Sequence, residues 1–80
     1  MRYLIVGELD GKRVFWRDCG NRAADISAWD TTPNRGYDGE DGYEYLQRTI
    51  TDRLPDKLNY ADGGPIHTLP TNLHIEPVIS

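Results

Sequence analysis

The chain has 80 residues and a formal net charge of −4, from 13 acidic and nine basic side chains. A length of this order makes one domain, so we expect a single compact domain over residues 1–80. So small a domain has a thin core and little room for a deep pocket, which favours a binding module or an oligomer over a self-contained enzyme. The acidic balance argues against a protein that binds nucleic acid by neutralising phosphates, because that mode needs a basic patch.

Cysteine content and hydropathy bear on where the protein works. The single cysteine, Cys19, excludes an internal disulfide framework, and we expect it to be a small buried hydrophobe. No apolar stretch is long enough to cross a membrane, and the N-terminus lacks the pattern of a secretory signal. We therefore expect a cytoplasmic protein, and we expect residues Met1 to Ser80 to be a complete gene product.

The clearest structural pattern is a β-hairpin centred on Asp10-Gly11. Apolar runs at residues 3–6 and 14–16 flank this dipeptide. Asp-Gly is typical of a type I′ turn, which needs positive φ at both central residues. A two-residue turn predicts the pairs Glu8–Arg13, Val6–Phe15, Gly7–Val14 and Ile5–Trp16. Both faces of the hairpin are then apolar, so we expect helices to cover one face and a loop or a second copy of the chain to cover the other.

A first helix is expected from Arg22 to Trp29, with Asn21 as its N-cap. Ile26 and Trp29 would share one face of this helix. The segment that follows contains Pro33 and several turn-forming residues, so we expect a loop there that extends to residue 42.

A second helix shows the stronger pattern. Asp41 can cap its N-terminus, and Glu44 completes a capping-box pattern three residues later. Pro55 disfavours helical geometry in the residue before it, so we expect the helix to end near Leu54. The apolar stripe expected to cover the sheet consists of Tyr43, Leu46, Ile50 and Leu54.

A C-terminal strand is expected to begin at residues 73–75 and to continue through residues 78–79. Pro77 has no amide hydrogen to donate, so this strand should lie at an edge of the sheet or bend there. Residues 66–69 could add one short strand. The predicted fold is α+β, in the order ββααβ: a small, mainly antiparallel sheet made of the N-terminal β-hairpin and the C-terminal strand, with two helices.

No motif for catalysis, a metal or a cofactor is found, and we predict a protein that is not an enzyme. Glycine and lysine between residues 7 and 12 lack the spacing of a P-loop and lie on the hairpin. His67 and His74 do not have a recognised metal-ligand spacing, and no serine or cysteine has the setting of a nucleophile. The acidic residues between 38 and 44 do not follow the EF-hand pattern.

The acidic and aromatic segment between residues 37 and 45 is the best candidate for a binding surface. Four acidic residues and no basic residue lie between positions 36 and 47. Tyrosine is enriched at protein interfaces, and acidic groups around it would steer a basic partner. A solvated segment that keeps the protein in solution is the alternative. The predicted contact residues are Tyr37, Asp38, Glu40, Asp41, Glu44 and Tyr45.

The sequence therefore favours an acidic protein that binds and inhibits or modulates a macromolecular partner with a basic surface. We expect no direct contact with nucleic acid or membrane. Small size, acidity and the lack of motifs fit a phage or mobile-element inhibitor of a host nucleic-acid-handling complex.

Two other functions stay open. A small-ligand or nucleotide-binding module could form at a homodimer interface, because one chain is too small for a deep pocket. Its ligand-binding residues would be Trp29, Arg35, Tyr60 and His67. Alternatively, the doubly apolar hairpin could join copies of the chain into an assembly.

Overall fold

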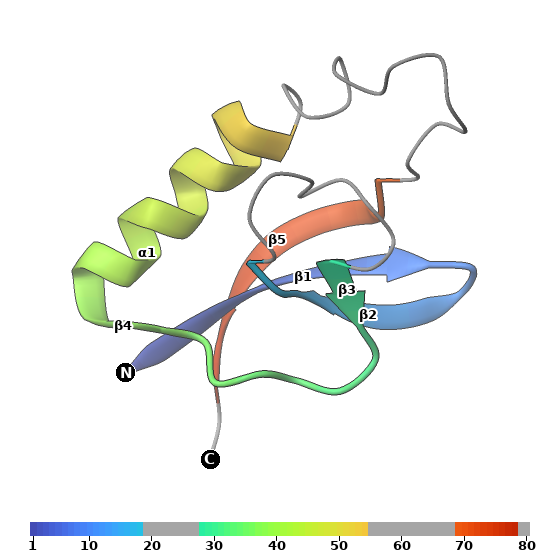
Figure 1. Ribbon diagram of the computed structural model, residues 1–80, viewed down its shortest axis with the longest axis horizontal. Coiled ribbons are helices and arrows are strands. Elements are labelled where there is room, and N and C mark those ends of the chain that lie inside the picture. The colour runs from blue at the N-terminus through green and yellow to red at the C-terminus, as the bar shows by residue number, and fades with distance from the viewer. Residues whose placement is uncertain (19–27, 55–68, 79–80) are drawn as a thin grey trace.

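The protein has an α+β fold in which one helix covers a small, curled antiparallel sheet (Figure 1). This computed structural model describes residues 1–18, 28–54 and 69–78. Helix α1 (Gly39–Arg48) continues into a π-helical segment, η2 (Thr49–Arg53). The strands are β1 (Arg2–Leu9), β2 (Lys12–Trp16), β3 (Trp29–Asp30), β4 (Tyr37–Asp38) and β5 (Thr71–Pro77).

Strand β1 is the centre of the sheet. Val6 pairs with Phe15 of β2 and also with His74 of β5, so β2 and β5 lie along opposite edges of β1. Strand β4 pairs with the first residues of β1, along the same edge as β2. The short β3 pairs with the outer edge of β2. The predicted antiparallel sheet of hairpin and C-terminal strand is confirmed.

The hairpin turn has the predicted geometry. Asp10 has a φ of 52° and Gly11 a φ of 76°, and three of the four predicted pairs form, from Val6–Phe15 to Glu8–Arg13. The fourth pair is wrong, because the ladder between β1 and β2 starts at Val6–Phe15. Trp16 pairs with Trp29 of β3 along the other edge of β2.

The prediction of two helices is not confirmed. Trp29, the expected last residue of the first helix, lies in β3, and Ala28 before it is buried in the main core. Residues 22–27 of that predicted helix lie outside the described part of the chain, as do its expected N-cap Asn21 and the expected buried Cys19. The helical pattern rested on a single apolar pair, and tryptophan packs well on a pleated surface. Pairing with β2 and burial of the ring therefore override that weak local pattern.

Helix α1 begins earlier than predicted. Asp38, not Asp41, is its N-cap residue, and residues 39–41, expected in a loop, are helical. Asp38 makes no side-chain cap bond. Its backbone instead pairs with Arg2 in the β1–β4 ladder, and the N–H of Gly39 donates to the carbonyl of Met1 at 2.8 Å. Strand pairing therefore decides where the helix starts, which a capping pattern cannot reveal.

The buried face of the helix is rotated from the predicted stripe. Leu46 and Leu54 are fully buried as expected, but Tyr43 is 39% exposed. Gly42 and Thr49 are buried in addition. The hydroxyl of Thr49 donates to the carbonyl oxygen of Tyr45 at 2.8 Å, which satisfies a buried polar group. A search for apolar residues overlooks both positions, because glycine and threonine do not count as apolar.

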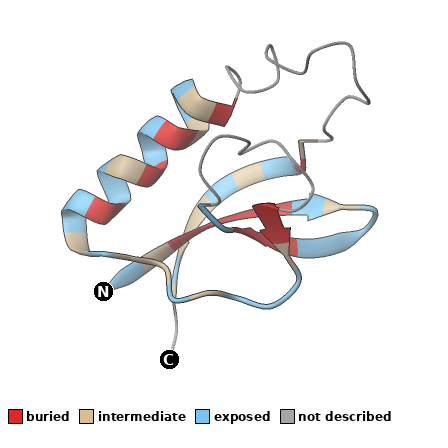
Figure 2. Ribbon diagram, viewed as in Figure 1, coloured by how far each residue is buried: buried red, intermediate tan, exposed pale blue. Residues whose placement is uncertain are grey.

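The sheet buries apolar side chains on both faces, as the hairpin pattern predicts. Figure 2 shows the buried residues running along the middle of the sheet, in β1 and β2. On the face toward the helix the core consists of Ile5, Val14, Trp16, Ala28, Trp29, Leu46 and Leu54. On the opposite face Leu4, Val6 and Phe15 form a smaller cluster, with Val78 packed against it. Val6 is only 1% exposed within one chain, so this second face is covered by the chain itself.

Strand β5 lies at the edge of the sheet and carries a β-bulge. Among the described residues it pairs with β1 alone, as Pro77 leads us to expect. Its pairing shifts by one residue opposite Gly7, and Asn72, with a φ of 54°, takes a left-handed conformation that asparagine tolerates. A Cβ on Gly7 would lie 2.8 Å from the Cβ of Pro70, so only glycine fits opposite the bulge. The predicted short strand at residues 66–69 falls mostly outside the described residues.

A methyl group at position 42 should destabilise the protein, although alanine is normally the better helix former. An ideal Cβ there would lie 2.7 Å from the carbonyl carbon of Tyr37, so α1 would have to move away from β4. Overpacking costs about 1–3 kcal/mol, which we expect to exceed the roughly 1 kcal/mol gained in helix propensity.

Chemical denaturation of Gly42→Ala should therefore give a lower free energy of unfolding than the native chain. The control is Gln47→Ala on the exposed side of α1, which should change it by less than about 0.5 kcal/mol. An unchanged or higher value for Gly42→Ala would contradict the close contact between α1 and β4.

Candidate functional site

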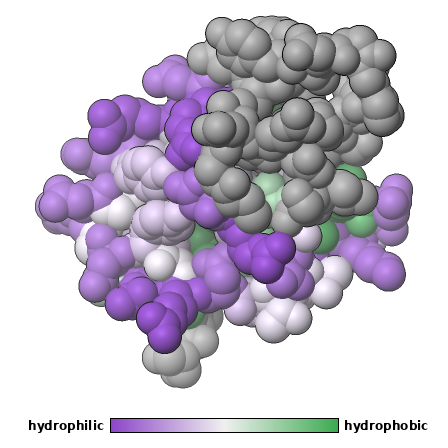
Figure 3. Space-filling model, in the orientation of Figure 1, coloured by the Kyte–Doolittle hydropathy of each residue, from purple (hydrophilic) through white to green (hydrophobic). Residues whose placement is uncertain are grey.

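Helix α1 presents three exposed carboxylates near its beginning. Glu40, Asp41 and Glu44 have no ion-pair partner within the described residues. Three acids of the sheet and its connections, in contrast, form the ion pairs Asp18–Arg53, Asp30–Arg17 and Glu76–Arg13. Hydrophilic side chains cover the outer side of the helix (Figure 3). The negative charge of this helix face is therefore left without a described internal counter-charge.

Asp38 belongs to the edge of this acidic surface. Its carboxylate lies 3.7 Å from the guanidinium of Arg2, with the side chain 75% exposed. An ion pair this exposed contributes little to stability. The guanidinium of Arg2 does offset the charge of Asp38. Asp38 is therefore not grouped with the three carboxylates that have no described counter-charge.

A hollow of about 320 Å³ lies beside the carboxylates, lined by Tyr3, Glu40, Tyr43 and Glu44. We call it the tyrosine hollow. The rings of Tyr3 and Tyr43 meet edge to face, with centroids 5.1 Å apart and an angle of 78° between their planes. Glu40, Tyr43 and Glu44 follow the i, i+3, i+4 spacing, which places them on one side of the helix.

The chemistry of the tyrosine hollow suits a positively charged group. Aromatic faces attract Lys or Arg through their quadrupole, and a carboxylate accepts charge-assisted hydrogen bonds from either. The two carboxylates that line the hollow stand beside two rings, one of them more than a third exposed. This is the combination that a partner's basic side chain could enter.

Tyr37 and Tyr45, two of the predicted contact residues, lie inside the fold instead. Tyr37 belongs to β4, not to a loop, and its ring stacks on Trp16 with centroids 6.1 Å apart. Tyr45 packs against both rings, 5.1 Å from Tyr37 and 6.4 Å from Trp16. Both tyrosines are partly buried against the main core, so most of their ring surface is already in contact within the chain.

Asp18 joins these tyrosines to the helix in a polar cluster. The hydroxyl of Tyr45 donates to Oδ2 of Asp18 at 2.6 Å, and Arg53 pairs with Oδ1 at 3.5 Å. Arg53 also donates to the Tyr45 hydroxyl, and its guanidinium lies 5.6 Å from the centroid of the Trp16 ring. The indole N–H of Trp16 is buried and has no acceptor among the described residues, where ring contacts and the cation of Arg53 hold this side chain.

The same cluster keeps its tyrosines protonated. Burial first, and then the charge of Asp18, raise the pKa of Tyr37 to about 12. Burial and the hydrogen bond to Asp18 also raise the pKa of Tyr45. Both hydroxyls therefore stay donors at neutral pH, in a structural role that sequence patterns do not reveal.

The residues of the predicted ligand site are not brought together in the described part of the chain. Trp29 is buried in the main core and only 8% exposed, so its ring offers no free face for stacking. Arg35 is exposed in the connection between β3 and β4. Tyr60 and His67 lie outside the described residues.

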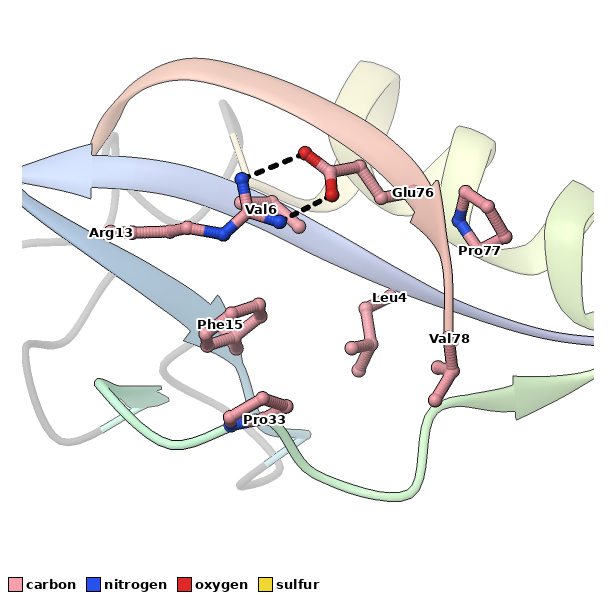
Figure 4. Close-up of a pocket in the computed structure, with 8 residues that line it drawn as sticks. All are labelled: Leu4, Val6, Arg13, Phe15, Pro33, Glu76, Pro77 and Val78. Carbon is pink, nitrogen blue, oxygen red and sulfur yellow. Dashed lines mark hydrogen bonds and ion pairs between the residues drawn. The ribbon is translucent and has the colours of Figure 1, made fainter. Parts of the chain in front are cut away.

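A second hollow, of about 290 Å³, lies on the opposite face of the sheet (Figure 4). On one side of it Arg13 of β2 reaches across Val6 and makes two hydrogen bonds to Glu76 of β5, one of them 2.9 Å long. The remaining lining is apolar and consists of Leu4, Val6, Phe15, Pro33, Pro77 and Val78. Sequence patterns cannot locate this hollow, because its walls come from four separate segments of the chain.

Within residues 1–18, 28–54 and 69–78, no group of three or more histidines, cysteines or acids is placed to hold a metal ion. In the same residues, no helix has the length and hydrophobicity needed to cross a membrane.

Comparisons with protein-family models, curated proteins and solved structures found no match for this chain. The candidate site therefore depends on the chain's own geometry.

Glu40, Asp41 and Glu44 are exposed on α1 and stay predicted contact residues, and Tyr3 and Tyr43 beside them become further candidates because they line the tyrosine hollow. Sequence reasoning assigned Tyr43 to the core stripe and overlooked Tyr3 in the first strand. The spacing of Glu40, Tyr43 and Glu44 was the available signal for the helical part. The contribution of Tyr3 follows only from the packing of α1 on β1.

Loss of the Tyr45 hydroxyl should destabilise the fold, because Asp18 and Arg53 would lose their shared partner. A net hydrogen bond of this kind contributes about 1 kcal/mol, so Tyr45→Phe should lower the free energy of unfolding by about that amount. Tyr43→Phe is the matched control, since this exposed tyrosine is outside the cluster. Equal denaturation midpoints for the two variants would contradict the structural role of the Asp18 cluster.

Proposed function

We propose that this chain is a non-enzymatic binding protein that contacts a basic surface of a macromolecular partner through the outer side of α1. The observation that carries this proposal is the group of three carboxylates without a described ion-pair partner, set beside the tyrosine hollow. The acids supply attraction over a distance, and the hollow supplies a contact that excludes water.

The position of the acids has a simple structural benefit, which does not account for the hollow. Carboxylates in the first turn of a helix interact favourably with its dipole, and Glu40 and Asp41 lie there. Like charges three or four residues apart, such as Glu40 and Glu44, oppose that gain by a few tenths of a kcal/mol. The dipole does not explain why a partly exposed tyrosine lies between them.

The two parts of the surface would contribute differently to binding. Complementary charge mainly raises the association rate, up to the limit that salt screening allows. Affinity comes mainly from a few well-packed groups at the centre of an interface, where tyrosine is enriched. Tyr43, flanked by Glu40 and Glu44, has the position of such a central group.

A nucleic-acid-handling protein is the natural class of partner, because its phosphate-binding surface is basic. An acidic protein docked on that surface would compete with nucleic acid and so inhibit or modulate the complex. A small acidic inhibitor from a phage or another mobile element fits this role. A partner of this class would retain the chain through Arg or Lys, without any nucleic acid bound to the chain itself.

Removing the three helix charges should weaken capture of the partner. The test uses the tagged native chain, the variant Glu40→Gln/Asp41→Asn/Glu44→Gln and a control as baits in lysate of the organism that encodes the chain. The control, Glu8→Gln/Asp10→Asn/Asp52→Asn, removes three exposed acids elsewhere. A partner held by the native chain and the control, and lost from the helix variant, is the expected result.

The captured partner then allows a kinetic measurement. Association of the native chain should slow as salt rises, and association of the helix variant should be slower and less salt-dependent. Identical association rates for the native chain and the helix variant would overturn the proposal, because the acidic surface would then have no role in recognition.

The tyrosine hollow can be tested separately from charge. Tyr43→Ser keeps all three carboxylates but removes one ring of the hollow. Its dissociation from the captured partner should be faster, with a loss of about 1–2 kcal/mol in binding free energy if Tyr43 is a central contact. Gln47→Ser, one turn further along the exposed side of α1, is the control and should leave binding unchanged. Native affinity for Tyr43→Ser would limit the proposal to electrostatic attraction.

A further inference from the structure

His74 on β5 lies between two hydrogen-bond acceptors. Its Nδ1 is 2.6 Å from the carbonyl oxygen of Asn72, and its Nε2 is 2.6 Å from Oε2 of Glu76. A neutral imidazole has one N–H donor, and its other nitrogen carries a lone pair. Both contacts can be hydrogen bonds only when the ring is a doubly protonated imidazolium.

The charged groups around the ring favour that form. Glu76 faces the ring from the same strand and also binds Arg13 of β2. On β1, Glu8 accepts a long hydrogen bond, 3.4 Å, from the side chain of Asn72. The hydrogen bonds to Asn72 and then Glu76 raise the pKa of His74, against smaller opposing effects of burial and of Arg13.

The two partners of His74 belong to different structural features. Asn72 is the residue of the bulge with positive φ. Glu76 forms, with Arg13, the bridge over Val6 on one side of the hollow in Figure 4. The imidazolium therefore connects the bulged end of the edge strand to the rim of the apolar hollow.

We propose that His74 is a protonation-dependent latch within edge strand β5, which joins the bulge at Asn72 to the Glu76 carboxylate beside the apolar hollow. The charged ring keeps the bulge and the Arg13–Glu76 bridge together. Loss of its proton leaves one nitrogen lone pair facing an acceptor oxygen, so one of the two contacts opens. Either the bulge at Asn72 or the Glu76 carboxylate that Arg13 binds across β1 is then less restrained, and β5 becomes more mobile there. This device is separate from the acidic surface of α1.

The pH window of the latch follows from its two titrating groups. The folded-state pKa of His74 is raised above 6.5, so its contribution is complete below about pH 6.5 and is lost as pH rises through the folded value. The hydrogen bond from Arg13, followed by that from His74, lowers the pKa of Glu76 from 4.5 to about 2. Its contribution is present above about pH 4.5 and is lost as pH falls toward 2. Both contacts of His74 are therefore fully formed between about pH 4.5 and about pH 6.5.

The first test is an NMR titration of the ring nitrogens in the native chain. We expect both nitrogens of His74 to carry protons at pH 6.5, and the pKa of the ring to fall in Glu76→Gln. A His67→Gln chain identifies the signals and serves as the control, since it leaves all groups of the latch in place. A His74 that titrates at or below 6.5, or whose pKa is the same in Glu76→Gln, would overturn the proposal.

The second test measures amide hydrogen exchange, corrected for the intrinsic effect of pH, at about pH 5.5 and about pH 8.5, on either side of the imidazole range. Amides of β5 in the native chain should lose protection at the higher pH while those of α1 keep theirs. In His74→Gln, β5 should be poorly protected at both values. A parallel change in β5 and α1, or a pH effect that persists in His74→Gln, would rule out a local latch.

Discussion

The fold depends on the burial of β1 on both faces and its pairing along both edges. Leu4, Ile5 and Val6 are consecutive and almost inaccessible, so alternate side chains enter the core under the helix and the smaller core on the other face. Hydrogen bonding to β2 and β4 on one edge and to β5 on the other leaves the strand with few unsatisfied backbone groups. An 80-residue chain can bury only a limited area, and one strand that serves two cores uses that area efficiently.

The placement of α1 follows from this arrangement. Pairing of β4 with the start of β1 fixes the chain immediately before the helix, and the missing side chain of Gly42 lets the helix lie against Tyr37. The face that turns inward is then set by contact with the sheet. Tyr43 is left partly exposed against Tyr3, and the neighbouring carboxylates point away from the core. The candidate binding surface is therefore a consequence of where β4 places the start of the helix.

The ionisable groups divide into two classes. Asp18, Asp30 and Glu76 each bind an arginine from a distant part of the chain, and these pairs tie strands and helix together. The acids of α1 have no such partner among the described residues. The tyrosines divide in the same way, since Tyr37 and Tyr45 are part of the internal Asp18 cluster whereas Tyr3 and Tyr43 line a surface hollow. The role of an acid or tyrosine in this chain therefore depends on the residues it contacts and does not follow from its residue type.

Features that depend on neighbouring residues could be predicted from the amino-acid sequence. The Asp10-Gly11 turn set the hairpin and its register, Pro77 marked an edge strand, and the apolar spacing of Leu46 and Leu54 indicated a helix that covers the sheet. Three other features became visible only in the folded chain: Trp29 lies in a strand, α1 starts at Gly39, and Tyr45 turns inward while Tyr43 stays exposed. These outcomes depend on contacts between residues far apart in the chain, whose energies exceed the local preferences that a sequence pattern can reveal.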